Sequence, residues 1–564
     1  FKQKTAYEIR LSLVGSEMCI RDRSDGAPPP KTLERQTLLG KKDSDDMDAL
    51  DTEPPGEDDA LIASRVRFLA GLACLNSVAL GFQIGAVSAA APLIQDTYDL
   101  NSFQLEMYEA SISAAAILGA VLAGVVSEPV GRLKAFQISS VLFIAGSLMQ
   151  AVSFGYYMLM VGVGIVGVAV GFGLSVDPIY IAEISPQGDR GYFVTWSEIA
   201  ITGGQVLGFA AGLVIEIIFS SWSGSWRIII GCGALTPIAL FLAVAFVIPE
   251  SPRWLAIHGR VDEARAVLAG LGLSRGAVDR TLEDIAEEQR IAPAEDASVV
   301  GLLTQRRALK PAVKRILLVG VGAAVAQQLS GCDAIFYNFL FSLEAVGINS
   351  TWISYSILLG LGVVKLCTAI LSCHLLDSVG RRPLILASAT GTAATLYVLA
   401  LFYAFCTTLK GHVAYQAGII FFYYVYIFVF ELGLGPGCWL IPSEVFYNAI
   451  RMRAMTLATF ANRCTTTGVV ATAISIEDAW SWAGYFAWYA STAAAGAAFL
   501  WIYLPETKGK SLETMYAHFE AITGSEEHSR PFTPSPFQRS LDGAGDAKAA
   551  AAARDQAASA SKIV

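Results

Sequence analysis

The segment ILLVGVGAAVAQQLSGCDAIFYNFLF, residues 316–341, carries Gln327, Gln328 and Asp333 inside a long apolar run. Amide and carboxyl groups are costly in the hydrocarbon of a membrane, and they normally face a bundle interior or a wet cavity. The segment therefore predicts a membrane helix that lines a functional cavity, whose other walls must come from the rest of the chain.

The composition indicates a membrane protein. Of the 564 residues, 54% are hydrophobic and only 16% are charged, and the mean hydropathy is +0.51. So few charges cannot cover the surface of a soluble domain. Most of the net charge of -9 comes from an acidic stretch, residues 43–59, which we interpret as a solvated tail. The cysteine spacing suits neither a metal site nor a disulfide framework.

Twelve apolar segments are long enough to cross a hydrocarbon core of about 30 Å as helices. They lie near residues 66–92, 108–127, 134–153, 157–180, 194–219, 227–248, 313–341, 352–376, 384–408, 414–441, 453–475 and 482–504. Lys and Arg in the short loops gather on the side of the N-terminus, so we expect both termini in the cytoplasm. The predicted fold is an all-α, multi-pass membrane protein.

The domain organisation follows from these segments. We expect the following order: non-native, adapter-like sequence (1–23), a disordered cytoplasmic tail (24–64), an N-terminal six-helix half (65–249), a cytoplasmic helical linker (250–311), a C-terminal six-helix half (312–510) and a disordered cytoplasmic tail (511–564). In the linker, residues 261–271 and 278–289 have the pattern of short amphipathic helices.

Three landmarks recur at nearly constant spacing, and they predict that the two halves are copies of one six-helix unit. The pairs are Gly131-Arg132 with Gly380-Arg381 (offset 249), Glu183 with Glu444 (offset 261), and Pro249-Glu250 with Pro505-Glu506 (offset 256). In such an architecture the substrate site lies between the halves, near the membrane midplane, and one half rocks against the other.

The landmarks belong to longer motifs: GVVSEPVGRLK (124–134), PIYIAEISP (178–186), PESPRWL (249–255), DSVGRR (377–382), GPGCWLIPSEVF (435–446) and PETKG (505–509). Together they resemble the sugar porter family of the major facilitator superfamily, over about residues 65–513. The resemblance implies a twelve-helix carrier that works by alternating access on a sugar or a related molecule.

The resemblance also implies salt bridges that hold the cytoplasmic gate shut in the outward-open state. The matching positions are Arg132, Glu183, Arg190, Asp377, Arg381, Glu444 and Arg451. The alternative is that these charges merely satisfy the positive-inside rule. Glu128, Pro129 and Leu133 depart from the family's usual Asp, Arg and Arg, which predicts a weaker network in the first half.

Polar residues deep in the apolar segments predict the substrate site. By resemblance, the positions that line a sugar site are Gln205, Gln327, Gln328, Asp333, Trp439 and Asn462, and Gln83 and Glu198 are further candidates. Amides suit a polyhydroxylated ligand because each offers both a donor and an acceptor. The alternative for a single amide is a hydrogen bond between packed helices.

Four details resemble the polyol transporters and favour a polyol or monosaccharide as the substrate. They are Asp333 in place of the usual Asn, Glu198 after Thr195-Trp196-Ser197, Lys365 in GVVK, and the adjacent Asn462-Arg463. An ionised carboxylate only accepts hydrogen bonds, which suits a ligand rich in hydroxyl donors. Asp333 could alternatively form a structural ion pair with Lys365 or Arg463.

The energy source is less clearly marked. Proton-coupled relatives carry an Asp in the first segment and an Arg partner in the fourth, whereas this chain has Gln83 and Val163. The sequence therefore favours facilitative uniport. The alternative is proton symport through another embedded acid, for which Asp333, Glu198 and Glu431 are candidates. A fourth acid, Asp177, is expected at a helix end near the headgroups.

The chain has no nucleotide loop, nucleophile elbow or zinc motif, so the sequence predicts no enzyme, cofactor, metal or nucleic-acid partner. The expected partners are a small polyol or sugar, the lipid bilayer and, under symport, protons. A sugar-sensing receptor built on a transporter fold is the competing class. We expect the plasma membrane as the location, with an organelle membrane as the alternative.

Overall fold

The computed structural model describes residues 57–185, 190–219, 222–291, 310–405, 408, 411–446, 450–508 and 512–523. Across these residues the regular structure is helical throughout, with no strand. The predicted adapter-like sequence, most of the N-terminal tail and the end of the C-terminal tail lie outside the described residues.

The first half begins with two helices that form one membrane span from Ser64 to Tyr98. Its helices are α2 (Glu57–Ala73), α3 (Leu75–Tyr98), α4 (Ser102–Val130), α5 (Arg132–Ala151), α6 (Tyr156–Ile184), α7 (Arg190–Phe219), α8 (Trp226–Cys232) and α9 (Leu235–Phe246). The short helices α8 and α9 together make the sixth span, from Trp226 to Phe246.

Three helices follow in the linker region: α10 (Pro252–Ile257), α11 (Val261–Leu271) and α12 (Arg275–Ile291). The second half then contains α14 (Pro311–Leu329), α15 (Cys332–Tyr337), α16 (Phe339–Ala345), α17 (Thr351–Val379), α18 (Arg381–Ala404), α20 (Val413–Val445), α21 (Arg451–Val470) and α22 (Ala473–Tyr503). After it comes α23 (Leu512–Thr523).

Ten helical segments in the described part are long and apolar enough to cross a membrane. The two remaining spans are α21 and α22, which have the length of a span but are not among those ten segments. In α21 the cause is visible in the sequence, because Arg451, Arg453, Asn462 and Arg463 all lie on this helix. The expected count of twelve spans agrees with this architecture.

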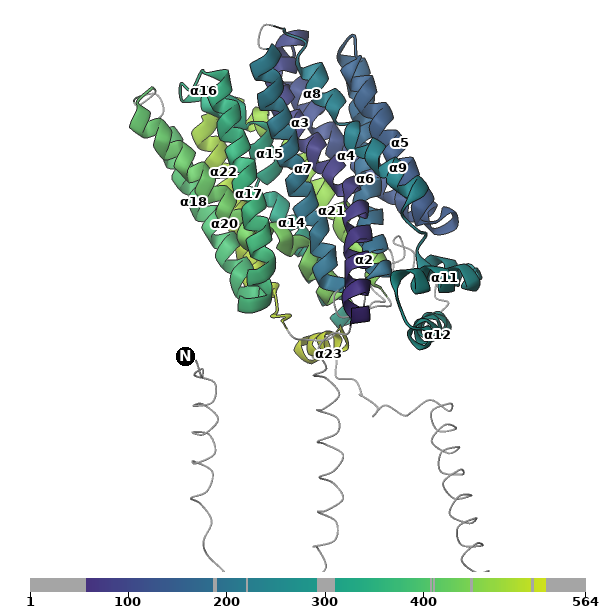
Figure 1. Cartoon of the computed structure of the whole chain (residues 1–564). Helices are drawn as coiled ribbons and strands as arrows, with labels where there is room; N and C mark the ends of the chain where they lie inside the picture. Colours follow the sequence, from purple (N-terminus) through teal and green to yellow (C-terminus); the bar gives the residue numbers. More distant parts are fainter. Residues whose placement is uncertain are drawn as a thin grey trace, which may run out of the picture. The chain divides into compact units, whose positions relative to one another are not determined.

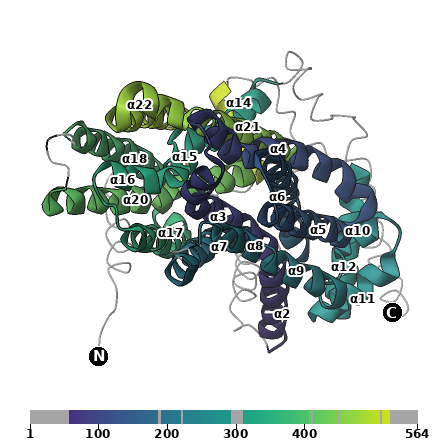
Figure 2. The same cartoon turned by 90° about the horizontal axis from the view of Figure 1, so that it is seen from above.

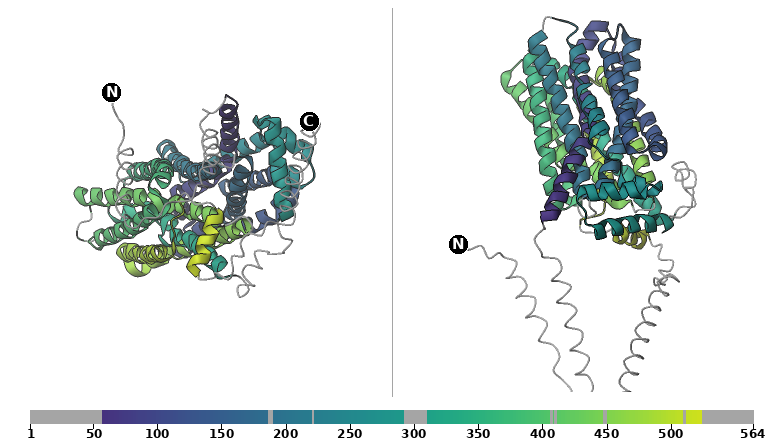
Figure 3. Two further views of the ribbon diagram at one scale, coloured as in Figure 1. Left: turned by 90° about the horizontal axis from the view of Figure 1, so that it is seen from below. Right: turned by 45° about the vertical axis from the view of Figure 1, so that its right-hand side comes forward.

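The two halves lie side by side, with α3–α9 in one group and α14–α22 in the other (Figures 1 and 2). They meet mainly where α7 packs on α17 and where α21 packs on α4. We call the end of the bundle that carries α11, α12 and α23 the inner end, and the opposite end the outer end (Figures 1 and 3).

The seventh span is broken within residues 316–341, the segment that carries Gln327, Gln328 and Asp333. Helix α14 ends at Leu329, and α15 begins only at Cys332. Between them Gly331 has a φ of 72°, a left-handed conformation that suits glycine, and an added Cβ would lie 2.5 Å from the ring of Tyr489. The break therefore places Gln327 and Gln328 in the last turn of one helix and Asp333 in the first turn of another.

Within the first half, α3 and α7 pack with their backbones in contact. A Cβ on Gly204 would lie 2.2 Å from the carbonyl oxygen of Val78, and one on Gly81 would lie 1.8 Å from that of Ile201. Small residues allow this close approach in membrane bundles, where van der Waals packing is a main attraction between helices.

Gly204→Ala should therefore destabilise the protein by about 1–3 kcal/mol, because the new methyl group forces the two helices apart. The measurement is the thermal unfolding of the detergent-solubilised protein. Gly203→Ala is the matched control: nothing lies within 4 Å of its added Cβ, so its unfolding temperature should stay the same or rise. Equal melting of the two variants would contradict this packing argument.

Candidate functional site

A network of amides ties three helices of the second half together. Gln327 Oε1 accepts hydrogen bonds from Gln328 Nε2 and Asn462 Nδ2, each at 3.1 Å, and Gln327 Nε2 donates to the carbonyl oxygen of Gly435 at 2.9 Å. Arg463 in turn donates from Nε and Nη2 to Asn462 Oδ1, at 3.0 and 2.6 Å. Four of the residues singled out in the sequence thus meet where the last turn of α14 packs against α20 and against the middle of α21.

A second contact joins this region to the first half. Lys365 Nζ donates to Gln205 Oε1 at 2.9 Å, from α17 across to α7, and lies 5.2 Å from the centroid of the Phe336 ring. The exposed fractions of Lys365 and Gln205 are only 5% and 2%. A buried ammonium group therefore lies at the interface of the halves and needs negative partners.

Three carboxyl groups supply that negative charge. Glu198 on α7, Asp333 on α15 and Glu431 on α20 all interact electrostatically with Lys365. Glu431 is fully buried, and neither of its oxygens has a hydrogen-bond partner among the described residues. With Arg463 close by, two cations face three carboxyl groups, so the cluster is neutral when one carboxyl group carries a proton.

Asp333 does not form the structural ion pair that the sequence left open. Among the ion pairs of the described residues, none joins Asp333 to Lys365 or Arg463. Its side chain is partly exposed, in contrast to the buried side chains of the two cations. Trp439 on α20 is also partly exposed.

Gln83 lies outside this cluster, although the sequence grouped it with the cavity residues. Its Nε2 donates to Ser147 Oγ at 2.6 Å, on α5, and the same atom lies close to Gly233, between α8 and α9. Gln83 therefore contacts other helices of its own half, because successive side chains on a helix point in directions about 100° apart.

Asp177 also differs from its expected place at a helix end. It lies seven residues before the end of α6, is buried, and accepts hydrogen bonds from Asn76 Nδ2 at 2.8 Å and Ser77 Oγ at 2.6 Å. These donors connect α6 to α3, so the carboxyl group serves the packing of the first half.

At the inner end, two ion pairs have the same design in the two halves. Arg132 donates to Glu183 from Nε at 3.1 Å and Nη2 at 2.8 Å, and from Nη1 to the Ser127 carbonyl. Arg381 binds Glu444 with Nη2 and Oε1 2.9 Å apart, and its Nη1 donates to the Leu376 carbonyl. Each pair lies within one half.

Three other predicted gate residues have less defined roles. Arg451 donates from Nη2 to the Ser443 carbonyl at 2.9 Å, at the start of α21. Arg190 begins α7 and Asp377 lies on α17, but their side chains fall outside what the structure describes.

Two further acids lie beside these ion pairs, Glu250 and Glu506, which the sequence marked only as repeat landmarks. The Glu250 carboxylate accepts hydrogen bonds from the backbone N–H groups of Arg132 and Leu133, at the start of α5. Glu506 does the same for Arg381 and Arg382 at the start of α18. Their common position directly after a proline, at equivalent places in the two halves, was the available signal.

The glycine of each Gly-Arg motif makes this contact possible. Gly131 and Gly380 have φ values of 93° and 111°, and added Cβ atoms would lie 2.4 and 3.0 Å from Oε2 of Glu250 and Glu506. A carboxylate at a helix N-terminus is favoured by the free N–H groups and the helix dipole. Each Gly-Arg motif therefore connects two acids. One caps the helix that begins after the glycine, and the other pairs with the arginine from another helix of the same half.

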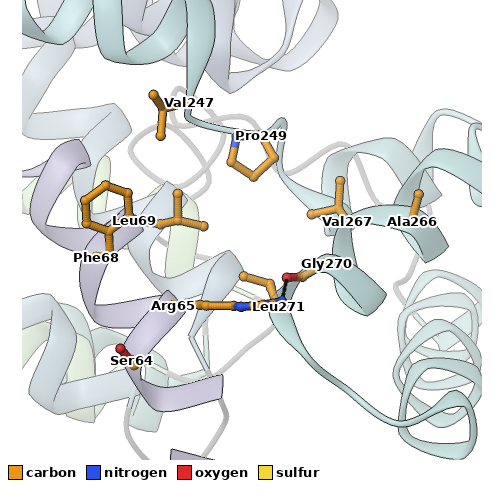
Figure 4. Close-up of a pocket in the computed structure, with 10 residues that line it drawn as sticks. All are labelled: Ser64, Arg65, Phe68, Leu69, Val247, Pro249, Ala266, Val267, Gly270 and Leu271. Atoms are coloured by element: carbon orange, nitrogen blue, oxygen red, sulfur yellow. Dashed lines mark hydrogen bonds between the residues drawn. The ribbon is translucent and has the colours of Figure 1, made fainter. Parts of the chain in front are cut away.

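A pocket of about 740 Å³ also opens at the inner end, between α2 and α11, with Arg65 donating from Nη1 to the Gly270 carbonyl (Figure 4). Its lining is mostly apolar: Ser64, Arg65, Phe68, Leu69, Val247, Pro249, Ala266, Val267, Gly270 and Leu271. None of these lining residues carries a side-chain amide, in contrast to the central cluster.

Twelve membrane spans in two similar halves, with a polar cluster between them, define a transporter of the major facilitator type. The family described as sugar (and other) transporter matches residues 69–519. This chain belongs to that family, and it is a multi-pass membrane transporter, not an enzyme.

Individual relatives agree with this assignment. The chain is 32% identical to "Probable polyol transporter 4" of Arabidopsis thaliana over 79% of this chain and 84% of the relative. It is 29% identical to "Myo-inositol transporter 1" of Cryptococcus neoformans over 87% and 86% of the two chains. The xylose transporter XylE from E. coli has a similar fold, with a TM-score of 0.68 and 23% identity, over 80% of this chain and 100% of that one.

The inner-end acids lead to a stability prediction. Partial burial raises the pKa of Glu506, but backbone N–H donors from Lys508, Arg381, Arg382 and Thr507 outweigh it and leave the pKa below the usual value. Glu506→Gln should therefore cost about 1 kcal/mol of stability near neutral pH, as for the loss of a helix cap.

The stabilisation by Glu506 is present while the group is ionised and is lost as the pH falls through its lowered pKa. Thermal unfolding of the two proteins should therefore differ at pH 7 and converge in acid. Glu128→Gln, at an exposed position on the inner part of α4, is the control and should leave stability unchanged. A difference between wild type and Glu506→Gln that is independent of pH would contradict the proposed cap.

Proposed function

We propose that this protein carries a polyol or a monosaccharide across a membrane by alternating access. The observation that carries the proposal is that buried polar side chains gather where the halves meet. They comprise the Gln327–Gln328–Asn462 network of the second half and the Gln205–Lys365 hydrogen bond between the halves. A ligand with several hydroxyl groups can bridge such groups, and its affinity can then differ between the two conformations.

Two acceptors are positioned for substrate hydroxyl groups. Gln328 Oε1 is buried and has no hydrogen-bond donor among the described residues, and the partly exposed Asp333 lies in the next helix of the same broken span. A buried acceptor without a donor costs free energy, which a bound hydroxyl group would recover. The names of the relatives, for polyols and myo-inositol, support the same substrate class.

The test is uptake of labelled sorbitol, mannitol, inositol and glucose by transport-deficient cells. Gln328→Leu should raise the KM for the transported compound by about tenfold or more, because a polar contact worth 1–3 kcal/mol is lost. Asp333→Asn should change the preference between polyols and glucose, because the amide replaces a pure acceptor with a donor and an acceptor.

Gln83→Met is the matched control, since Gln83 lies outside the cluster and its substitution should leave the KM unchanged. An equal effect of the Gln83 and Gln328 substitutions would contradict the assignment of the cluster. Binding without uptake of any compound would indicate the sugar-sensing receptor instead.

For the energy source, we propose facilitative uniport. The position of the first-segment acid holds Gln83, whose amide nitrogen donates to Ser147, and its partner position holds the buried Val163. No titratable pair is present at these two positions. We further propose that the inner end faces the cytoplasm, because the loop cations gather there, and that the membrane is the plasma membrane.

One observation favours a second candidate, proton symport through Glu431. The unpartnered carboxyl group of Glu431 lies close to Lys365, and the excess of acids over bases in the cluster leaves room for one proton. Glu198 and Asp333 are the other acids that could hold it.

Uniport predicts that substrate uptake down its gradient keeps its rate when a protonophore collapses the proton gradient. It also predicts that uptake by the Glu431→Gln variant responds to the protonophore as the wild type does. Accumulation of substrate above its external concentration, lost with the protonophore and lost in Glu431→Gln, would overturn uniport and support symport.

A further inference from the structure

Two acids on α4, Glu106 and Glu109, lie near the outer end of the bundle and are not part of the central cluster. We propose that Glu109 is a proton-binding site of the outer gate, and that the carrier closes this gate only when Glu109 holds a proton taken from the non-cytoplasmic solution. The proposal rests on the proposed alternating-access function and orientation, but it does not depend on the identity of the substrate.

In this structure the halves are joined at the outer end. Glu106, in the second turn of α4, accepts hydrogen bonds from the backbone N–H of Ser475 at 2.5 Å and from its Oγ at 2.8 Å, at the start of α22. Tyr355, in the first turns of α17, donates from its hydroxyl group to the Ala89 carbonyl at 2.5 Å. Both contacts cross from one half to the other, so they must break when the outer end opens.

Glu106 has a hydrogen-bond donor for each of its carboxyl oxygens. Both of its oxygens are occupied by donors at a helix N-terminus, an arrangement that stabilises a carboxylate. The side chain is fully buried, so the contact is also protected from water and salt while the gate is closed.

Glu109 lies one turn further into the same interface and has no such partners. Its exposed fraction is 0%, and neither carboxyl oxygen has a hydrogen-bond partner among the described residues. The titratable groups that interact with it are Glu106 and Tyr108 on its own helix, Tyr337 on α15 and Tyr485 on α22. None of these interacting groups is a cation.

Closing the outer gate around an ionised Glu109 would bury a charge without a donor or a cation, next to the carboxylate of Glu106. Such a charge is costly, and two neighbouring carboxyl groups in one buried site do not both ionise easily. Because both Glu106 oxygens accept hydrogen bonds whereas the Glu109 oxygens have no partner among the described residues, Glu109 is the carboxyl group that takes up the proton. The closed gate therefore binds one proton more than the open gate.

The proton enters and leaves on the same side. While the inner end is open, Glu109 stays buried beneath the closed outer gate, so its proton returns to the non-cytoplasmic solution when that gate opens again. Proton binding here does not drive accumulation and is compatible with uniport. Low external pH favours the outer-closed state, and high external pH favours the outward-open state.

The experiment measures gate opening without substrate. Ser113 lies one turn inward from Glu109 on the same helix face and is buried. Ser113→Cys serves as a reporter, labelled from outside by a membrane-impermeant thiol reagent at pH 5.5–8 in the full-length protein. Protein without the reporter gives the background from the native cysteines. The labelling rate is measured in the reporter protein with Glu109 and in the reporter protein that also carries Glu109→Gln. Dividing the first rate by the second cancels the ionisation of the thiol itself.

We expect this ratio to rise with pH by up to about tenfold per unit, because one proton separates the two gate states. Glu106→Gln should raise labelling at every pH while keeping the pH dependence, since it weakens the contact with Ser475 but leaves Glu109 in place. Glu128→Gln on the same helix should change neither. A ratio that does not vary with pH overturns the proposal, and this result does not depend on whether any polyol is transported.

Discussion

A charged group inside a membrane protein must be paired, hydrogen-bonded or neutral, and this constraint shapes each polar site of the carrier. Lys365 meets it with Gln205 and three surrounding acids, and Asp177 meets it with two donors from the neighbouring helix. Where pairing is incomplete, as at Glu431 and Glu109, the structure leaves a group whose protonation can change with conformation. The sites that can respond to the transport cycle are therefore the incompletely satisfied ones.

At the inner end, the two halves contain the same arrangement of a glycine, an arginine and two acids. In each half a glycine with positive φ lets a carboxylate approach the first N–H groups of the next helix, and the following arginine pairs with an acid on another helix of that half. Each unit is complete within its own half. The halves can therefore move against each other at the inner end without breaking these pairs, as rigid-body rocking requires.

Much of the fold could be predicted from the sequence because hydrophobic length and repeated motifs are local signals. The spans, the repeat and the amides of Gln327 and Gln328 needed no tertiary information. Other predictions depended on the direction in which a side chain points. Gln83 has the depth of a cavity residue but contacts its own half, and Asp177 is buried where a helix end was expected, because depth along a helix does not show which neighbour a side chain meets.

By itself, the sequence determined the class of protein, the twelve spans and the presence of costly polar groups at membrane depth, since these follow from composition and spacing along the chain. Only the tertiary structure decided which of those groups meet. It broke the seventh span at Gly331, joined Gln205 to Lys365 across the halves, and closed the outer end around Glu106 and Glu109. These pairings connect residues more than a hundred positions apart or on opposite halves, and packing geometry alone sets them.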